Sequence, residues 1–202
     1  MIHMTRSIHT AGVAHAACLA VALVCMASSA AAQEPRPADV KAAFLVNFAK
    51  FTEWSSDVLP AGAPIAVCVM GDEEVARALE RLVKGRPAQG RELKVLRLNV
   101  KILSLPEDST VRSCHILYAS GLDAKLWPVL LRTIEGAPVF SVSDSEGFAE
   151  RGGLAALYVE LKMMRFAINI DTIRRSGLRV SAGVLGLARI VKDDPGLPRV
   201  KG

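Results

Sequence analysis

Two cysteines and one histidine are the side chains of this sequence best suited to nucleophilic, metal or redox chemistry. The 202 residues hold four of each type, but two cysteines and three histidines fall within the first 32 residues. Only Cys68, Cys114 and His115 lie further along the chain. A zinc centre needs three or four ligands and a hydrolytic triad needs a histidine held by a third group, so one imidazole supports neither. We predict no catalytic, cofactor or metal site and no enzyme, and we interpret His115 as a packed structural histidine.

The first 32 residues have the pattern of a secretory signal peptide. Arg6 precedes an apolar run over 11–27, and the small residues SSAAA follow at 28–32. Because this run is short for a membrane-spanning helix, we predict a leader cleaved after Ala32; an uncleaved membrane anchor is the alternative. Export to an oxidising compartment predicts a disulfide between Cys68 and Cys114, and two separate buried thiols are the alternative.

Polar residues and glycines follow three apolar segments, where an open parallel sheet binds its ligands. The first site has no GxGxxG spacing and places three carboxylates at 72–74, so it is unsuited to a dinucleotide phosphate. The acidic loop at 144–150 does not match the spacing of a calcium loop. A tight turn between strands is the alternative for its glycines. The candidate ligand rim consists of Gly71, Ser120, Asp144 and Ser145.

The elements that must position these residues alternate between apolar and amphipathic segments. This alternation predicts an α/β fold with a mostly parallel sheet, and the last two strands predict an antiparallel C-terminal hairpin. Pro128 marks either a kink or the first turn of its helix. We predict one domain over 33–192 and a disordered tail over 193–202. The expected strands are 65–70, 92–100, 114–120, 137–144, 154–161 and 164–170, and the expected helices are 40–56, 72–85, 123–136 and 171–193, the last broken at Gly177.

The charge of the chain does not favour a nucleic-acid partner. The formal net charge is +5, and the sequence has no run of lysines and arginines. Nucleic-acid-binding domains usually cluster such charge on one face.

Aromatic residues are concentrated in the first predicted helix. Val40, Phe44, Phe48 and Phe51 recur on one face of a helix that Asp39 would cap. We expect this face to pack onto the sheet. Trp54, at the end of the helix, is the preferred surface anchor because tryptophan is enriched in binding hot spots.

Five segments in order resemble the YfiR family of periplasmic proteins. The resemblance covers residues 40–192 and implies a Rossmann-like three-layer α/β sandwich without a bound dinucleotide. It also implies a dimeric periplasmic regulator. The segments are VKAAFLVNFAKFTEW, AVCVMGDEEVARAL, SCHILYAS, VSDSEGFAERGG and MRFAINIDTIRRSGLRVSAGVLGLARIV.

The resemblance implies a protein that binds and restrains an inner-membrane signalling enzyme. The family's namesake represses a diguanylate cyclase through the cyclase's periplasmic part, which lowers cyclic di-GMP and disfavours biofilm. A periplasmic small-molecule sensor acting on a sensor kinase is the alternative, and an enzyme of unknown reaction is a third. The candidate partner-binding residues are Trp54, Phe51, Leu185, Leu187 and Ile190.

Two positions depart from the family pattern. Ala167 stands where relatives often carry an acidic residue, and Leu161-Lys162 stands where the hairpin turn often has Asp-Gly. A primed two-residue turn needs positive φ, which leucine and lysine resist. We therefore expect a longer or displaced turn.

Overall fold

A computed structural model of the chain describes residues 35–104 and 110–196. The predicted leader lies outside these residues. The elements in chain order are α2 (Pro37–Lys50), β1 (Thr52–Glu53), β2 (Ile65–Met70), α3 (Glu73–Val83), β3 (Leu93–Leu98), the 3-10 segments η2 (Val100–Ser104) and η3 (Thr110–Ser113), β4 (Ile116–Ala119), α4 (Leu126–Ile134), β5 (Phe140–Ser143), β6 (Ala155–Glu160), β7 (Met163–Asn169), α5 (Ile170–Ser176), β8 (Arg179–Val180), α6 (Ala182–Leu187) and β9 (Arg189–Val191).

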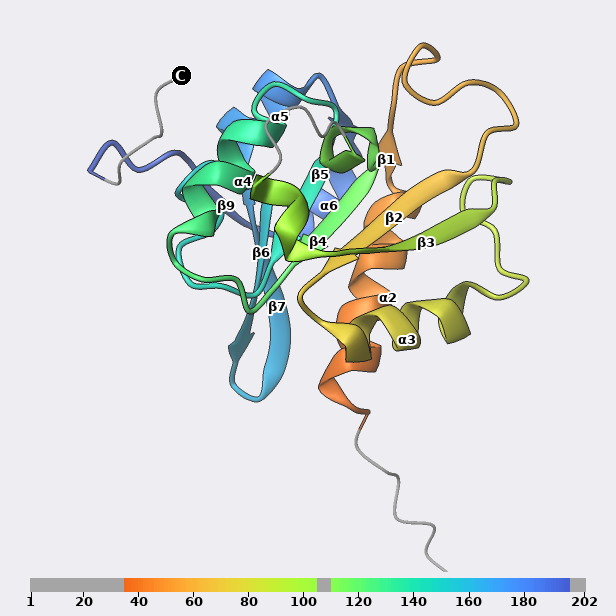
Figure 1. Ribbon diagram of the computed structural model, residues 1–202, viewed down its shortest axis with the longest axis horizontal. Coiled ribbons are helices and arrows are strands. Elements are labelled where there is room, and N and C mark those ends of the chain that lie inside the picture. Colours follow the sequence, from red (N-terminus) through yellow and green to blue (C-terminus); the bar gives the residue numbers. More distant parts are fainter. Residues whose placement is uncertain (1–34, 105–109, 197–202) are drawn as a thin grey trace, which may run out of the picture. The chain divides into compact units, whose positions relative to one another are not determined.

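Seven strands form one sheet in the order β3-β2-β4-β5-β6-β7-β9 (Figure 1). All neighbouring pairs are parallel except β6 and β7, which form an antiparallel hairpin. The predicted mostly parallel sheet with an antiparallel C-terminal hairpin is confirmed. A second, two-stranded sheet joins β1 to β8.

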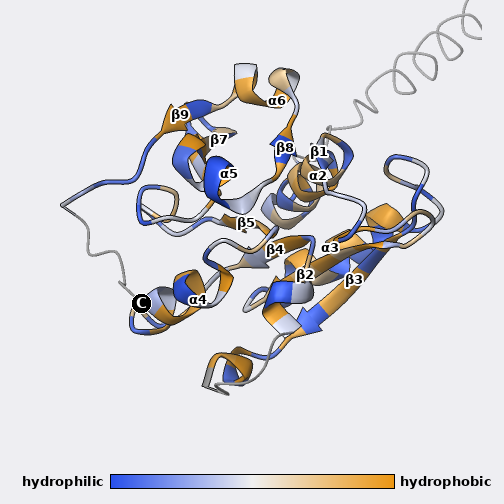
Figure 2. Ribbon diagram, turned by 90° about the horizontal axis from the view of Figure 1, so that it is seen from above, coloured by the Kyte–Doolittle hydropathy of each residue, from blue (hydrophilic) through white to orange (hydrophobic). Residues whose placement is uncertain are grey.

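Both faces of the sheet are buried, which explains why its central strands are apolar at almost every position (Figure 2). Successive residues of a strand point to opposite faces. Val67 and Tyr118 pack in one core cluster with α2 and α3, whereas Cys68 and Leu117 pack in another with α4. The predicted three-layer sandwich is therefore confirmed.

Helix α2 begins earlier and ends earlier than predicted. It starts after Arg36 with Pro37 in its first turn, so Asp39 lies inside the helix and is not its cap. Asp39 instead accepts hydrogen bonds from the guanidinium groups of Arg36 and Arg81, at 2.8 and 2.9 Å. The helix ends at Lys50, because the chain then pairs with β8.

The aromatic face of α2 is only partly the one predicted. Phe48 is buried, stacks on Phe140 of β5 with ring centroids 4.8 Å apart, and meets Phe166 of β7 edge-on at 5.3 Å. Phe44 is half-buried and packs on the same cluster. Phe51 is 49% exposed, because it follows the helix and no longer shares its periodicity.

The predicted long C-terminal helix is wrong. Gly177 adopts a left-handed conformation (φ 68°) and ends α5, as its position suggested. Beyond it, β8 pairs with β1, and β9 adds a parallel edge to β7. Only α6 between them is helical, so Ile190 lies on an edge strand and not on a helix. Pairing with distant strands outweighs the helical pattern of this segment.

The hairpin turn between β6 and β7 is a two-residue turn, contrary to expectation. Glu160 pairs with Met163, and Leu161 and Lys162 between them both have positive φ, at 49° and 62°. These are the angles of a primed turn, which suits the twist of the flanking strands but is strained for non-glycine residues. Strand pairing imposes this conformation on the turn. The hairpin projects beyond the neighbouring strands (Figure 1).

The remaining local predictions are mostly confirmed. Cys68 and Cys114 form a disulfide, with Cα atoms 5.9 Å apart, that ties β2 to the residue preceding His115 and β4. Pro128 lies in the first turn of α4, so the kink alternative is excluded. The Nδ1 atom of His115 accepts from the Ala66 amide at 3.0 Å. Burial lowers the pKa of His115 and keeps its ring neutral, as expected of a structural histidine.

Candidate functional site

A cluster of charged and polar side chains joins three element ends at the carboxyl edge of the sheet. The Lys41 ammonium of α2 lies 2.6 Å from Asp144, which follows β5, and 3.5 Å from Asp72, which caps α3. Ser120, which follows β4, donates to the other oxygen of Asp144 at 2.6 Å. The three charged side chains, Lys41, Asp72 and Asp144, are 16, 21 and 28% exposed. Of the predicted ligand rim, Ser120 and Asp144 belong to this cluster.

Tyr118 lies beneath the cluster and is fully buried. The Lys41 ammonium lies 5.8 Å from the centroid of its ring, within the range of a cation–π contact. Burial is the main cause that raises the pKa of Tyr118, to about 12. The phenol therefore stays protonated.

The ion pair holds both partners in their charged forms. Burial alone would raise the pKa of Asp144, but the hydrogen bonds from Lys41 and Ser120 outweigh it and leave that pKa below its usual value. Burial alone would lower the pKa of Lys41, and the bond to Asp144 leads the effects that raise it instead. Neither group is suited to proton transfer near neutral pH, so the cluster acts as an ionic lock between α2 and the strand ends.

The other two members of the predicted rim, Gly71 and Ser145, do not belong to this cluster. Gly71 has a positive φ of 82°, and a Cβ there would lie 1.9 Å from the carbonyl oxygen of Ser120. Its glycine is required for this close approach of two backbones. Ser145 donates its amide to the Ser143 hydroxyl at 3.0 Å and lines a cavity instead. Sequence reasoning missed Lys41, because a lysine on a predicted helix has no distinguishing signal.

The cavity lies between α4, α5 and the loop over 144–154 that joins β5 to β6, and has a volume of about 400 Å³. Trp127 and Leu131 of α4 line it, as do Thr172 and Arg175 of α5. A volume of this size is within the range of small-molecule pockets. The predicted rim contributes only Ser145 to it.

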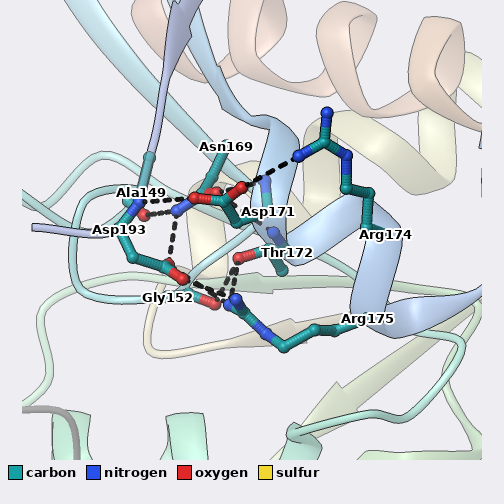
Figure 3. A network of polar contacts seen from close by, with 8 residues as sticks. All are labelled: Ala149, Gly152, Asn169, Asp171, Thr172, Arg174, Arg175 and Asp193. Atoms are coloured by element: carbon teal, nitrogen blue, oxygen red, sulfur yellow. Dashed lines mark hydrogen bonds and ion pairs between the residues drawn. The ribbon is translucent and has the colours of Figure 1, made fainter.

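A polar network forms the α5 side of this cavity (Figure 3). Buried Asn169 caps α5 by accepting from the amides of Asp171 and Thr172, and it donates to Ala149 at 2.6 Å and to Asp193 at 2.9 Å. Arg175 of α5 also pairs with Asp193, whose side chain is 2% exposed. The chain is therefore held at Asp193, where we expected the disordered tail to begin. Residues 197–202 of that tail lie outside the described part of the chain.

The predicted partner-binding residues fall into two groups. Trp54 is half-buried, donates its indole N–H to Pro138 at 2.9 Å and packs edge-on against His115, so it serves the fold and is a poor surface anchor. Leu185 is also half-buried against the core. In contrast, Phe51, Leu187 and Ile190 are 49, 77 and 48% exposed. They remain candidates for contact with a partner.

The hairpin tip carries a second set of exposed apolar residues that sequence reasoning missed. Val159, Leu161 and Met163 are 69, 84 and 50% exposed. They alternate with polar residues, as apolar residues do in any strand with one buried face. The sequence therefore contains no sign of their exposure, which follows from the projection of the hairpin.

The described part of the chain contains neither a metal-binding cluster nor a membrane-spanning helix. Over residues 35–104 and 110–196, no group of three or more histidine, cysteine or acidic side chains is placed to hold a metal ion. No helix within the same ranges has the length and apolar character needed to cross a membrane.

Comparison with known proteins identifies a family. A YfiR/HmsC-like family model matches residues 38–189. A solved conserved domain protein from Vibrio cholerae O1 biovar El Tor is similar over 77% of this chain and 60% of its own, with 14% identity and a TM-score of 0.52. At this identity the likeness concerns the fold alone.

Two further solved structures match less well. One is the ABC domain in complex with L-Trp from Streptococcus pneumonia, with 12% identity over 62% of this chain and 54% of its own, and a TM-score of 0.44. The other is a ligand-free, open substrate-binding protein with adhesive properties from Clostridium difficile, with 14% identity over 69% and 59%, and a TM-score of 0.45. This chain spans between 54 and 60% of the length of the three solved proteins.

Proposed function

The chain belongs to the YfiR/HmsC-like family, and we propose that it binds and restrains an inner-membrane diguanylate cyclase. Members of this family are regulatory proteins, which supports a role as a periplasmic regulator of cyclic di-GMP signalling. The observation that carries the proposal is the family match, which spans nearly all of the described domain.

The proposed mechanism is differential binding. A repressor that binds the inactive conformation of the cyclase more tightly than the active one shifts the population toward the inactive state. No side chain of the repressor needs to perform chemistry for this. The ionic lock at Lys41, in which every charge has a partner, agrees with such a role.

The exposed apolar residues near the end of α2 and in α6 and β9 support a protein partner. The Ser181 amide, at the start of α6, donates to the Phe51 carbonyl at 3.0 Å, so Phe51 lies beside that helix. Exposed Leu187 is the last residue of α6, and exposed Ile190 lies on the edge strand β9. We propose these three residues as the contact surface, and a homodimer as the form of the free protein.

The first experiment measures intracellular cyclic di-GMP with this gene deleted and then restored. Under the proposal, deletion raises the level and restoration lowers it again. Restoration with Leu187→Asp should fail to lower it, while Val159→Asp, at a similarly exposed position of the hairpin, should succeed. An unchanged level on deletion under several growth conditions would refute repression of a cyclase.

One observation favours a second candidate, a periplasmic small-molecule sensor acting on a sensor kinase. The cavity of about 400 Å³ has the size expected for such a ligand. A ligand present at a hundred times its dissociation constant would stabilise the protein by about 2.7 kcal/mol. Thermal unfolding in the presence of metabolite mixtures tests this, and the absence of any shift would count against the sensor.

A further inference from the structure

The interior of the cavity beside α4 and α5 is apolar. Ile134, Ala137 and Val139 line it and are buried in the core, and the rings and methyl groups of Trp127 and Leu131 add to this surface. Small-molecule pockets typically combine such a lining with a few converging polar groups.

Ser141 supplies one buried polar group. It is 2% exposed, lines the cavity, and accepts a hydrogen bond from the Leu154 amide at 2.9 Å. Its hydroxyl is therefore a polar group on the cavity wall that can donate a hydrogen bond to a ligand oxygen.

The arginines that line the cavity differ in whether they form an ion pair with a carboxylate. Three arginines and three acidic residues line the cavity. Arg175 is engaged: its hydrogen bond with Asp193 leads the causes that raise its pKa, and the charge of Glu135 adds to them. Its guanidinium also donates to Thr172 at 2.9 Å.

Arg132 and Arg151 have guanidinium donors to spare. Across the described ranges, neither lies within 4.0 Å of a carboxylate. Arg151 donates to the Glu146 carbonyl at 2.6 Å and lies across Gly147, where an added Cβ would be 3.0 Å from its Nη1 atom. A guanidinium presents five donors in a planar fork that matches carboxylate and phosphate oxygens.

We propose that this cavity binds a small organic anion, with an apolar ring system against Trp127 and an anionic group at Arg132 and Arg151. The ligand is recognised by two features together, apolar bulk and a carboxylate, phosphate or sulfonate group. The inference goes beyond restraint of a cyclase, since Phe51, Leu187 and Ile190 are not among the residues that line the cavity.

A pair of fluorescent probes tests the proposal on the purified protein. 8-Anilinonaphthalene-1-sulfonate and N-phenyl-1-naphthylamine share a ring skeleton, and only the first carries an anionic group. We expect one sulfonate probe per chain, bound at least about tenfold more tightly than the neutral probe, because a hydrogen bond to a charged group is worth a factor of this order. Competition by benzoate and by phenyl phosphate then identifies the preferred head group.

Three variants assign the binding to this cavity. Ala124→Trp, at an exposed lining position, should exclude both probes. The double variant Arg132→Met/Arg151→Met should bind the two probes equally, while Arg77→Met/Arg86→Met, whose residues lie outside the cavity, should behave as the wild type. Each variant is first shown to unfold at the wild-type temperature.

Equal affinity of the wild type for the two probes would overturn the anion site. Tight sulfonate binding that survives both Ala124→Trp and the double arginine variant would show that the probe binds elsewhere, and would refute the assignment to this cavity. Neither result depends on cyclic di-GMP, so failure here is distinguishable from failure of the proposed regulatory role.

Discussion

Replacing Lys41 with methionine tests whether the ionic lock stabilises the fold. The change removes the ammonium group that lies 2.6 Å from Asp144 and 3.5 Å from Asp72, while keeping most of the apolar stem. Asp144 then keeps the hydrogen bond from Ser120. The cluster would hold two carboxylates with no cation between them.

The burial of the pair sets the expected magnitude. Breaking an exposed ion pair costs about 0 to 1 kcal/mol, and removing one partner of a buried pair costs about 3 to 5 kcal/mol. The side chains of Lys41 and Asp144 are 16 and 28% exposed, between these limits. We therefore expect Lys41→Met to lower the free energy of unfolding by about 1 to 3 kcal/mol at pH 7.

The pH dependence follows from the direction of the Asp144 shift. Its pKa is lower in the folded protein than in the unfolded chain, so the pair contributes stability above the unfolded pKa. That contribution is lost as pH falls through the folded pKa. The cost of Lys41→Met should therefore be largest near neutral pH and shrink in acid.

Urea denaturation followed by circular dichroism measures this difference. Arg81→Met is the matched control, because Arg81 also pairs with α2 but is 54% exposed, and we expect it to cost less than about 1 kcal/mol. The double variant Lys41→Met/Asp144→Asn should be more stable than the sum of its single changes predicts. If Lys41→Met lowers the free energy of unfolding no more than Arg81→Met does, or by an amount independent of pH, the claim that the ion pair stabilises the fold is refuted.

Two further changes test the packing of α2 and the strain of the hairpin. Phe48→Ala should lower the free energy of unfolding by about 3 to 5 kcal/mol, because Phe48 stacks in the core, while exposed Phe51→Ala should change it by less than about 0.5 kcal/mol; similar costs in urea denaturation would contradict the assigned faces. Leu161→Asn/Lys162→Gly should raise the melting temperature by about 2 to 4 °C, because this pair accepts the positive φ of both turn residues. A lower melting temperature in calorimetry would show that the turn is not strained.

Most of the sheet was predictable from local pattern. Uninterrupted apolar runs such as 65–70 mark strands buried on both faces, and the carboxylates at 72–74 mark the start of a helix. The cysteine pair indicated the disulfide through the oxidising setting alone, and the order of strands and helices indicated a parallel sheet. The isolated histidine was interpreted as packed, and it is half-buried with a ring nitrogen that accepts from the Ala66 amide. Each of these signals comes from a short stretch of chain or from the number of cysteines and histidines.

What failed depended on partners distant in sequence. Residues 178–193 have a helical pattern, yet pairing with β1 and β7 turns parts of them into strands. The exposure of Phe51, the half-burial of Trp54 and the strained turn at Leu161 likewise follow from neighbours that no local pattern names.

The sequence by itself determined the class of the fold, the disulfide and the family, because periodicity, composition and motif order are properties of the chain. The tertiary structure alone decided which polar residues meet. Lys41 reaches Asp144 across 103 positions, and Arg175 reaches Asp193 from a helix to an ordered C-terminal segment. Whether an aromatic or charged side chain serves the core, a lock or a cavity depends on which distant surfaces surround it.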